Sequence, residues 1–336
     1  MLEHGGQLRR AAQRYGRPLE EWLDLSTGVN PRGWRDTETL DAAWAHLPEE
    51  CDGLAEAAQE YYGSPAALPI AGSQAAILNV PRMRKACRVG VLAPAYFEHA
   101  LRWQEAGHEV ISLTPAQCEA AATTLDVLVL LNPNNPTGYR FARNELLRWH
   151  ALLACRGGWL IVDEAFADAR GEDSLAAMSE REGLVLLRSL GKFFGLPGAR
   201  VGFVLAAPSF LKSLAERLGP WTVSGPSRVV AGRALQDRAW QAATRARLRA
   251  DGARLAALLE GQSHPPAGGC ELFQWCASSQ APAIHESLAR TGILTRLFES
   301  PPGIRFGLPG SEAEWQRLEN ALRAVRGEQF ACAQTR

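Results

Sequence analysis

Two short stretches in the middle of the chain place charged side chains in apolar surroundings. In SLGKFFGLPGAR, residues 189–200, Lys192 stands among glycine, phenylalanine and leucine, with Ser189 before it and Arg200 after it. In WLIVDEA, residues 159–165, Asp163 ends an apolar run. An amine in apolar surroundings has a lowered pKa, which makes it a better nucleophile and proton carrier near neutral pH. These stretches therefore indicate a chemical rather than a purely structural site.

Asp163 needs a partner if its strand is buried. An isolated carboxylate inside a protein costs several kcal/mol unless a cation or hydrogen-bond donors face it. The partner could be Lys192 or an arginine in a salt bridge. It could also be the protonated ring nitrogen of a bound cofactor.

Two loops add groups that suit an anion or a polar ligand. In LPIAGSQAAILNV, residues 68–80, Gly72 permits a tight turn, and the N–H groups of Ser73 and Gln74 open a helix. Such a helix start could seat a phosphate, and an ordinary helix cap at Ser73 is an equally good interpretation. In NPNNPTG, residues 132–138, prolines and a glycine fix an irregular loop, whose asparagine amides we expect to point into a cleft.

The surrounding pattern predicts an α/β fold with a mainly parallel sheet covered by helices on both faces. Helical segments, residues 97–107 and 143–157 among them, alternate with short apolar runs typical of buried strands. The predicted strands are residues 86–94, 108–115, 126–134, 159–165, 183–190 and 200–208. Open α/β sheets bind ligands at the carboxyl ends of their strands, where the polar groups above lie.

The later part of the chain predicts a smaller α+β domain. A helical stretch from Gly225 to Gly261 is followed by a strand at 270–276, a helix near 284–290, strands at 293–298 and 303–307, and a closing helix that begins at SEAE. A chain of 336 residues fits two domains. We expect an N-terminal arm and part of the small domain at 1–40, the large domain at 41–224, and the small domain at 225–336.

Composition excludes several classes of partner. Thirty-six basic residues balance thirty-six acidic ones, so no net field attracts nucleic acid or an anionic membrane. No apolar run approaches the roughly 20 residues that span a bilayer. Seven scattered cysteines without metal-binding spacing indicate reduced thiols and no metal site. We expect a cytoplasmic protein with a small-molecule partner.

The motifs GSQ, NPNNPTG, DEAF and SLGK, together with Arg200, resemble those of the class I/II aminotransferases, which have PLP-dependent transferase fold type I and use pyridoxal 5'-phosphate (PLP). The resemblance implies that Lys192 forms the Schiff base with the cofactor and that Asp163 pairs with its ring nitrogen. It also implies that Asn135 donates to the ring's O3' and that Tyr96 stacks on the ring. By the same resemblance, the cofactor phosphate would be held by Gly72, Ser73, Gln74, Ser189 and Arg200.

Two departures from that family's pattern concern the same site. Many members carry a tyrosine that contacts O3' where this chain has Phe166. Related enzymes often have a Tyr-Pro pair, which reaches the neighbouring subunit's phosphate, near Leu47-Pro48. Members are usually dimers, so the resemblance implies a homodimer, although Leu47 cannot make that contact.

The N-terminal segments EHGGQLRRAAQRYG and LDLSTGVNPRG, together with GIRFGLPG, resemble the L-threonine-O-3-phosphate decarboxylases of cobalamin biosynthesis. The resemblance implies decarboxylation of L-threonine O-3-phosphate to (R)-1-amino-2-propanol O-2-phosphate and CO2. Arg305 matches a carboxylate-binding arginine and Arg296 one that meets a substrate phosphate, although the two roles could be exchanged. The implied substrate-binding residues are His4, Gly28, Asn30, Arg296 and Arg305.

The candidate residues could also have purely structural roles, and the chain could have another function. Either arginine could make a surface ion pair, His4 could be a mobile terminal residue, and Asn30 could be a turn former before Pro31. A histidinol-phosphate or related aminotransferase is the main alternative enzyme. A regulatory module with a PLP fold would usually carry a DNA-binding domain, for which the chain has no basic patch. The absence of G-x-G-x-x-G argues against nicotinamide binding.

Overall fold

The computed structural model describes residues 5–38 and 41–334, the segment 328–334 by its backbone alone. The chain forms two compact units. The large unit comprises Gly33–Asn135 and Tyr139–Arg245, and the small unit comprises the residues up to Arg32, Pro136–Gly138 and the residues from Ala246. The large unit thus includes helix α9, Gly225–Gln236, which follows the boundary expected at residue 224. The division into functional domains stays a prediction.

The large unit is built on a seven-stranded, mainly parallel sheet, which confirms the predicted fold class. The strand order is β2-β8-β7-β6-β5-β3-β4; β8 runs antiparallel to both β2 and β7, and all other pairs from β7 to β4 are parallel. All six predicted strands are present. The strands are β2 (Leu68–Ile70), β3 (Arg88–Leu92), β4 (Glu109–Leu113), β5 (Val127–Leu131), β6 (Trp159–Asp163), β7 (Leu184–Ser189) and β8 (Gly202–Ala206).

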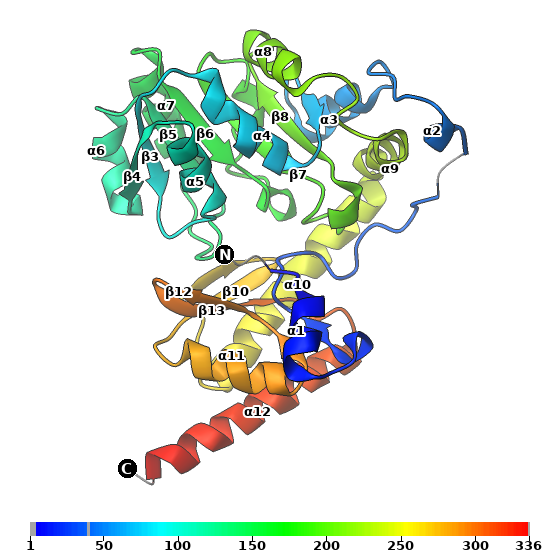
Figure 1. The fold of residues 1–336 in the computed structure, drawn as a ribbon, viewed down its shortest axis with the longest axis vertical. Helices are drawn as coiled ribbons and strands as arrows, with labels where there is room; N and C mark the ends of the chain where they lie inside the picture. The colour runs from blue at the N-terminus through cyan, green and yellow to red at the C-terminus, as the bar shows by residue number, and fades with distance from the viewer. Residues whose placement is uncertain (1–4, 39–40, 335–336) are drawn as a thin grey trace. The chain divides into compact units, whose positions relative to one another are not determined.

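Helices cover both faces of this sheet because both faces are apolar. Val127 and Val129 belong to a buried cluster with side chains of α4 (Ser73–Asn79), α5 (Glu98–Glu105) and α8 (Pro208–Leu218), and Figure 1 shows α4 and α5 across one side of the sheet. Intervening side chains such as Leu128 point to the opposite face. There α6 (Cys118–Ala122) and α7 (Arg143–Ala154) contact β5 and β6. Helices α2 (Asp41–Ala45) and α3 (Leu54–Tyr62) contact α9.

The small unit contains a four-stranded antiparallel sheet in the order β12-β13-β10-β9. Helix α11 contacts both β12 and β13 and, on its other side, α12, as Figure 1 shows. A short parallel pair joins β1 to β11. The elements are α1 (Leu8–Tyr15), β1 (Leu23–Asp24), α10 (Arg238–Gly261), β9 (Gly268–Cys270), β10 (Phe273–Ala277), α11 (Ala281–Arg290), β11 (Ile293–Leu294), β12 (Arg296–Glu299), β13 (Pro302–Gly307) and α12 (Glu312–Gln334).

Three predicted elements of this region are divided in the structure. The helical stretch after Gly225 breaks at Asp237, which ends α9 before α10 begins. The strand expected at 270–276 is a hairpin, because β9 ends at Cys270 and turns into β10. The strand expected at 293–298 is two strands with different partners, β11 and β12. Periodicity finds such segments but cannot show where a strand changes its partner.

The cap predicted at SEAE is present at the start of α12. The backbone N–H of Glu314 donates to Ser311 Oγ over 3.3 Å, and the N–H of Ser311 donates back to the Glu314 carboxylate over 3.1 Å. This reciprocal pair is a capping box. Among the residues described, no helix is long and apolar enough to cross a membrane.

Candidate active site

Asp163 lies at the carboxyl end of β6 and is only 5 % exposed. Its Oδ1 accepts the backbone N–H of Ala165 over 3.0 Å, and its Oδ2 lies 3.0 Å from Nε2 of His99. His99 is 2 % exposed. The buried carboxylate therefore has an imidazole beside it, a partner that the sequence did not predict.

His99 reaches Asp163 because of its place on α5. His99 lies in the first turn of α5, and its backbone N–H donates to the carbonyl of Tyr96, in the loop before the helix, over 3.3 Å. The Tyr96 and His99 rings meet edge to face with centroids 6.3 Å apart. The His99 imidazole holds the Asp163 carboxylate by a hydrogen bond or, when protonated, by an ion pair.

The turn before α4 requires glycine at position 72. Gly72 has a φ of +71° and is the N-cap of α4, so Ser73 is the first helical residue and does not cap the helix. No side chain caps these amides. A Cβ on Gly72 would lie 2.6 Å from Arg200 Nη2. The guanidinium thus packs directly on the glycine beside the start of the helix.

Strands β7 and β8 bring Ser189 to the same helix start. Ser189 pairs with Gly202 across the two strands, and its Oγ accepts the backbone N–H of Gly191 over 3.3 Å. A Cβ on Gly202 would lie 2.6 Å from the backbone nitrogen of Ser73. The start of β8 therefore abuts the N-terminus of α4, and Ser189, paired with Gly202, lies on the strand next to it.

Gln74 has a different environment from the one expected. Its side-chain Nε2 donates to Glu98 over 2.8 Å, and its Oε1 accepts the hydroxyl of Tyr96 over 3.3 Å. Burial, followed by the charge of Glu98, raises the pKa of Tyr96 to about 12. The Gln74 side chain therefore fixes the tyrosine, and only its backbone remains for an anion.

The asparagines of NPNNPTG have separate tasks. Asn132 exchanges two hydrogen bonds with the backbone of Phe141, at 3.0 and 3.2 Å, which close the base of the loop. Asn134 donates its amide to the carbonyl of Pro94 over 2.8 Å and so ties this loop to the one that carries Tyr96. The expectation that all three amides point into a cleft is wrong for these two, because both are buried against backbone. Asn135 is half-buried.

Lys192 follows β7, the strand next to β6 in the sheet. Its Nζ lies 5.4 Å from the ring centroid of Phe166, in the loop after β6. Phe166 is buried, and Lys192 is half-buried. The amine therefore lies beside an aromatic ring at the carboxyl ends of β6 and β7.

A buried ionic network lies directly behind Asp163 and Ser189. The Arg188 guanidinium contacts the Glu164 carboxylate at 2.6 Å and the Asp168 carboxylate at 3.3 Å, and its Cζ lies 4.6 Å from the centroid of the Tyr62 ring. Glu164 follows Asp163, and Arg188 precedes Ser189. Breaking one member of such a network leaves uncompensated buried charge, so the network fixes β7 against the loop after β6.

Asp168 should make stability depend on pH. Burial raises the pKa of Asp168 to about 6, opposed by Arg188 and Arg245, whereas its ordinary value is 3.8. The folded protein holds this proton more tightly than the unfolded chain, so the stabilisation is present below the ordinary value and is lost as pH rises towards 6. Between pH 4 and 6, the free energy of unfolding of the wild type should fall by roughly 1–3 kcal/mol more than that of Asp168→Asn, which cannot titrate at this position.

Urea unfolding at pH 4, 5, 6 and 7 measures this difference. Asp173→Asn, in the same loop but outside the network, is the matched control and should keep the wild-type pH dependence. Parallel curves for the wild type and Asp168→Asn would contradict the assignment.

The small unit holds the residues expected to bind substrate. Arg296 on β12 and Arg305 on β13 are direct cross-strand partners. Arg305 is 6 % exposed, and its Nη2 donates to the Ser26 carbonyl over 2.7 Å. Burial, then repulsion from Arg296, lowers the pKa of Arg305 to about 10. Arg305 is therefore a buried, oriented cation, and a surface ion pair does not describe it.

Gly28 and Asn30 are buried in the loop that follows β1. Asn30 Oδ1 accepts the backbone N–H of Arg32 over 3.0 Å, so it does form the turn that its place before Pro31 suggested. His4 lies outside the described residues.

A pocket of about 120 Å³ lies between α1, α11 and the β11–β12 segment of the small unit. Its lining includes the cationic or hydrogen-bonding side chains of Arg10, Arg14, His285 and Arg296. Arg14 also pairs with Glu286 at 3.3 Å, and His285 Nδ1 lies 2.8 Å from Thr295 Oγ1. The lining has the charge and the donors that suit an anion.

Comparison with known proteins identifies the class. The family model described as Aminotransferase class I and II matches residues 20–322, and the chain belongs to this family. The threonine-phosphate decarboxylase of Pseudomonas aeruginosa is 55 % identical over 322 residues, which cover 96 % of this chain and 97 % of that protein. A threonine-phosphate decarboxylase of Sinorhizobium sp is 38 % identical over 96 % of this chain and 97 % of its own length.

Among solved structures, the histidinol-phosphate aminotransferase from Sinorhizobium meliloti in complex with pyridoxal-5'-phosphate superposes with a TM-score of 0.85. It is 19 % identical, and the match covers 98 % of this chain and 96 % of that one. At this identity the likeness establishes the fold, in agreement with the predicted fold class.

Proposed function

We propose that this chain is a PLP-dependent decarboxylase that converts L-threonine O-3-phosphate to (R)-1-amino-2-propanol O-2-phosphate and CO2 in cobalamin biosynthesis. The observation that carries the proposal is the 55 % identity, over nearly the full length of both chains, to the threonine-phosphate decarboxylase of Pseudomonas aeruginosa. A histidinol-phosphate aminotransferase is the second candidate, because proteins of that name are also related, one of them 31 % identical over 70 % of this chain.

The residues of the large unit fit PLP. The buried Asp163 carboxylate, held by His99, suits a protonated ring nitrogen. The uncapped amides of α4, with the Arg200 guanidinium on Gly72 and the Ser189 hydroxyl on the adjoining strand, suit a phosphate. Lys192 would hold the aldehyde covalently, Tyr96 would cover one ring face, and Asn135 would donate to O3'.

The protein's own groups have defined roles in this proposal. When bound, PLP supplies an electron sink for the pair of electrons that the departing CO2 leaves on Cα. The Asp163 carboxylate would accept a hydrogen bond from the ring nitrogen and so favour its protonated form. Lys192 would give way to the substrate amine and would then donate the proton that replaces the carboxyl group on Cα.

Arg305 and Arg296 would hold the two anionic ends of the substrate. We assign the carboxylate to Arg305, because its buried guanidinium is oriented by Ser26 and by the Phe273 ring, 5.0 Å from Cζ. A planar, fixed fork suits bidentate contact with a carboxylate. We assign the phosphate to Arg296, because it lines the pocket that also contains Arg10 and Arg14. Two fixed ends set which Cα bond can break.

Gly72→Ala tests the proposed phosphate site. The new Cβ would strike Arg200 Nη2 at a backbone φ of +71°, so we expect PLP affinity to fall at least roughly 10-fold, the loss of one charge-assisted hydrogen bond. Gly53→Ala is the matched control, because Gly53 is also an N-cap glycine, at φ +86°, with nothing within 4 Å of a Cβ. Titration of the apoprotein with PLP measures both; equal losses would refute the site-specific clash.

An assay without an amino acceptor separates the two candidate enzymes. A decarboxylase releases CO2 from L-threonine O-3-phosphate without 2-oxoglutarate and does not transfer nitrogen from histidinol phosphate. Strict dependence on 2-oxoglutarate would instead establish the aminotransferase.

We further propose that the enzyme is a cytoplasmic homodimer. Trp44 and Leu47, which are 73 % and 65 % exposed on the large unit, are the kind of apolar side chains that interfaces cover. Cysteines 51, 87, 118, 155, 270 and 276 are free thiols, as expected in a reducing compartment. Light scattering should give twice the chain mass of 36.5 kDa; a single chain mass at micromolar concentration would exclude the dimer.

A further inference from the structure

Two segments of the large unit carry the amine and the carboxylate of the candidate site. Asp163 ends β6, and the segment after it contains Phe166 and Asp168, whereas Lys192 lies in the segment after β7. The Lys192 amine lies against the Phe166 ring. The proposed reaction needs this amine at a fixed place relative to Asp163, so the two segments must keep one arrangement.

The residue after Lys192 is anchored by aromatic packing. The Phe193 side chain is fully buried, and its ring meets those of Phe194 and Trp240 edge to face, with centroids 5.1 and 5.5 Å away. Phe194 also stacks on Trp240 at 5.7 Å. The backbone is held as well, because the Trp34 N–H donates to the Phe194 carbonyl over 2.9 Å. A displacement of Phe193 would therefore displace Lys192.

Arg245, on α10, contacts both segments. Its Cζ lies 5.3 Å from the centroid of the Phe193 ring, and its Nε donates to the backbone carbonyl of Asp168 over 2.9 Å. Its Nη2 donates to the hydroxyl of Tyr61, on α3, over 3.0 Å. These two hydrogen bonds orient the planar guanidinium, and its charge attracts the aromatic ring. One side chain thus joins the segment after β6 to the residue beside Lys192, within the large unit.

We propose that Arg245 is a positioning residue, which acts through Phe193 and the Asp168 backbone to set the place of the Lys192 amine relative to Asp163. The inference rests on the proposed role of Lys192 as the covalent anchor of PLP. It adds a residue that none of the sequence motifs includes, and its effect should appear in the capture of PLP rather than in the binding of substrate.

Two forms of the cofactor isolate this role. PLP can bond to Lys192, whereas 4-deoxypyridoxine 5'-phosphate has a methyl group in place of the aldehyde and can bind only through its ring and phosphate. When PLP is mixed with Arg245→Gln apoprotein, the rate at which borohydride quenching traps it on Lys192 should fall roughly 10–100-fold, the effect of a misplaced reacting group. The affinity for the analogue should stay within about 3-fold of wild type.

Turnover gives a second measurement. The kcat for CO2 release should fall at least roughly 10-fold in Arg245→Gln with KM within about 3-fold of wild type, because the returning proton depends on Lys192 and the proposed substrate residues lie in the small unit. Arg245→Lys keeps a cation without the two directed bonds and should be intermediate. Tyr61→Phe removes one partner of Arg245 and should have a smaller effect, which Arg245→Gln should mask in the double variant.

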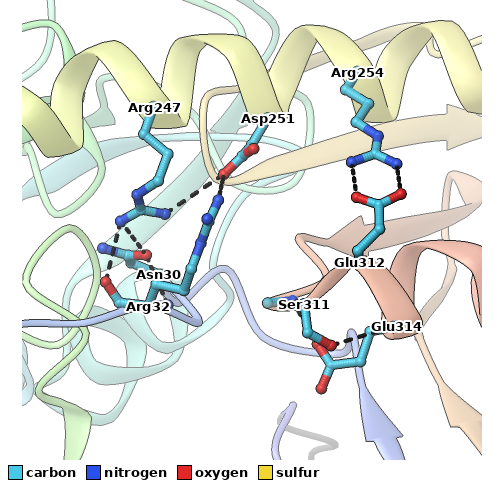
Figure 2. Close-up of polar contacts among 9 residues, drawn as sticks. Asn30, Arg32, Arg247, Asp251, Arg254, Ser311, Glu312 and Glu314 are labelled. Carbon is cyan, nitrogen blue, oxygen red and sulfur yellow. Dashed lines mark hydrogen bonds and ion pairs between the residues drawn. The ribbon is translucent and has the colours of Figure 1, made fainter.

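Arg254→Gln is the matched control. Arg254 also lies on α10 and also combines directed bonds with an aromatic contact. It forms a bidentate pair with Glu312, at 2.7 and 2.5 Å (Figure 2), and its Cζ lies 4.4 Å from the centroid of the Trp315 ring. All three residues belong to the small unit. The change removes the same charge and a similar contact from the same helix, so the trapping rate and kcat should not change.

The outcomes separate two failures. Wild-type trapping rates in Arg245→Gln and Tyr61→Phe, or equal losses for PLP and the analogue, would overturn the positioning role while the wild type still traps PLP on Lys192. If Arg245→Gln does not fold, the trapping rates of Arg245→Lys and Tyr61→Phe decide the question. Trapping of PLP on Lys85 or Lys212 in the wild type would instead overturn the proposed role of Lys192 and, with it, this role of Arg245.

Discussion

Lys192→Ala should lower CO2 release from L-threonine O-3-phosphate by roughly 10³-fold or more, because one side chain supplies both the covalent anchor and the returning proton. The fold should survive, since Lys192 is only half-buried beside Phe166. The kcat of the purified variant, saturated with PLP, measures this effect. An activity within 10-fold of wild type would contradict the assignment.

The composition of the chain makes the covalent assignment unusually easy to check. Only three lysines occur, Lys85, Lys192 and Lys212. Borohydride reduction of the holoenzyme followed by peptide mapping should label Lys192 alone. Lys85→Ala and Lys212→Ala are the controls and should keep wild-type kcat and labelling; a label on either of these lysines would move the site elsewhere.

Asp163→Asn should have the second largest effect. The substitution keeps the shape of the side chain and a hydrogen bond to the Ala165 N–H, but removes the negative charge beside His99. Loss of a preorganised charge at a reacting group costs on the order of 10²–10³-fold in kcat. The measurement is kcat at saturating substrate and PLP, so that weaker cofactor binding does not mimic the effect.

Asp126→Asn provides the control for Asp163→Asn. Asp126 also adjoins the sheet, before β5, where its Oδ2 accepts the Arg88 N–H over 2.9 Å. It stands at the amino end of a strand rather than at the carboxyl end, where the cofactor is proposed to bind. The control should keep wild-type kcat, and equal losses in both variants would mean that Asp163 acts only through stability.

The large unit was readily predicted because its strands are continuous apolar runs. Segments such as residues 126–134 and 183–190 are buried on both faces, so their composition alone marks them as strands of a parallel sheet. The small unit was harder to predict. Ile293 and Arg296 belong to different sheets, and nothing in ILTRLF marks the change of partner.

The residues of the candidate site also differ in how well the sequence predicts them. Residues in local motifs, such as Gly72 with its positive φ, are constrained by their neighbours in the chain and are visible in the sequence. His99 contacts a carboxylate 64 residues away, and only tertiary packing brings the two together. Asn134 was misjudged for the same reason, since its backbone partner, Pro94, belongs to another segment. Asn132 was misjudged because it closes its own loop against the backbone of Phe141.

One isotope experiment tests the central claim most directly. The enzyme, with PLP and no amino acceptor, is given L-threonine O-3-phosphate that carries ¹³C in its carboxyl group and ¹⁵N in its amino group. We predict that the ¹³C appears as CO2 and bicarbonate while the ¹⁵N stays in 1-amino-2-propanol O-2-phosphate, in equal amounts. Loss of the ¹⁵N from the substrate skeleton with the ¹³C retained, or no turnover until 2-oxoglutarate is added, would contradict the account.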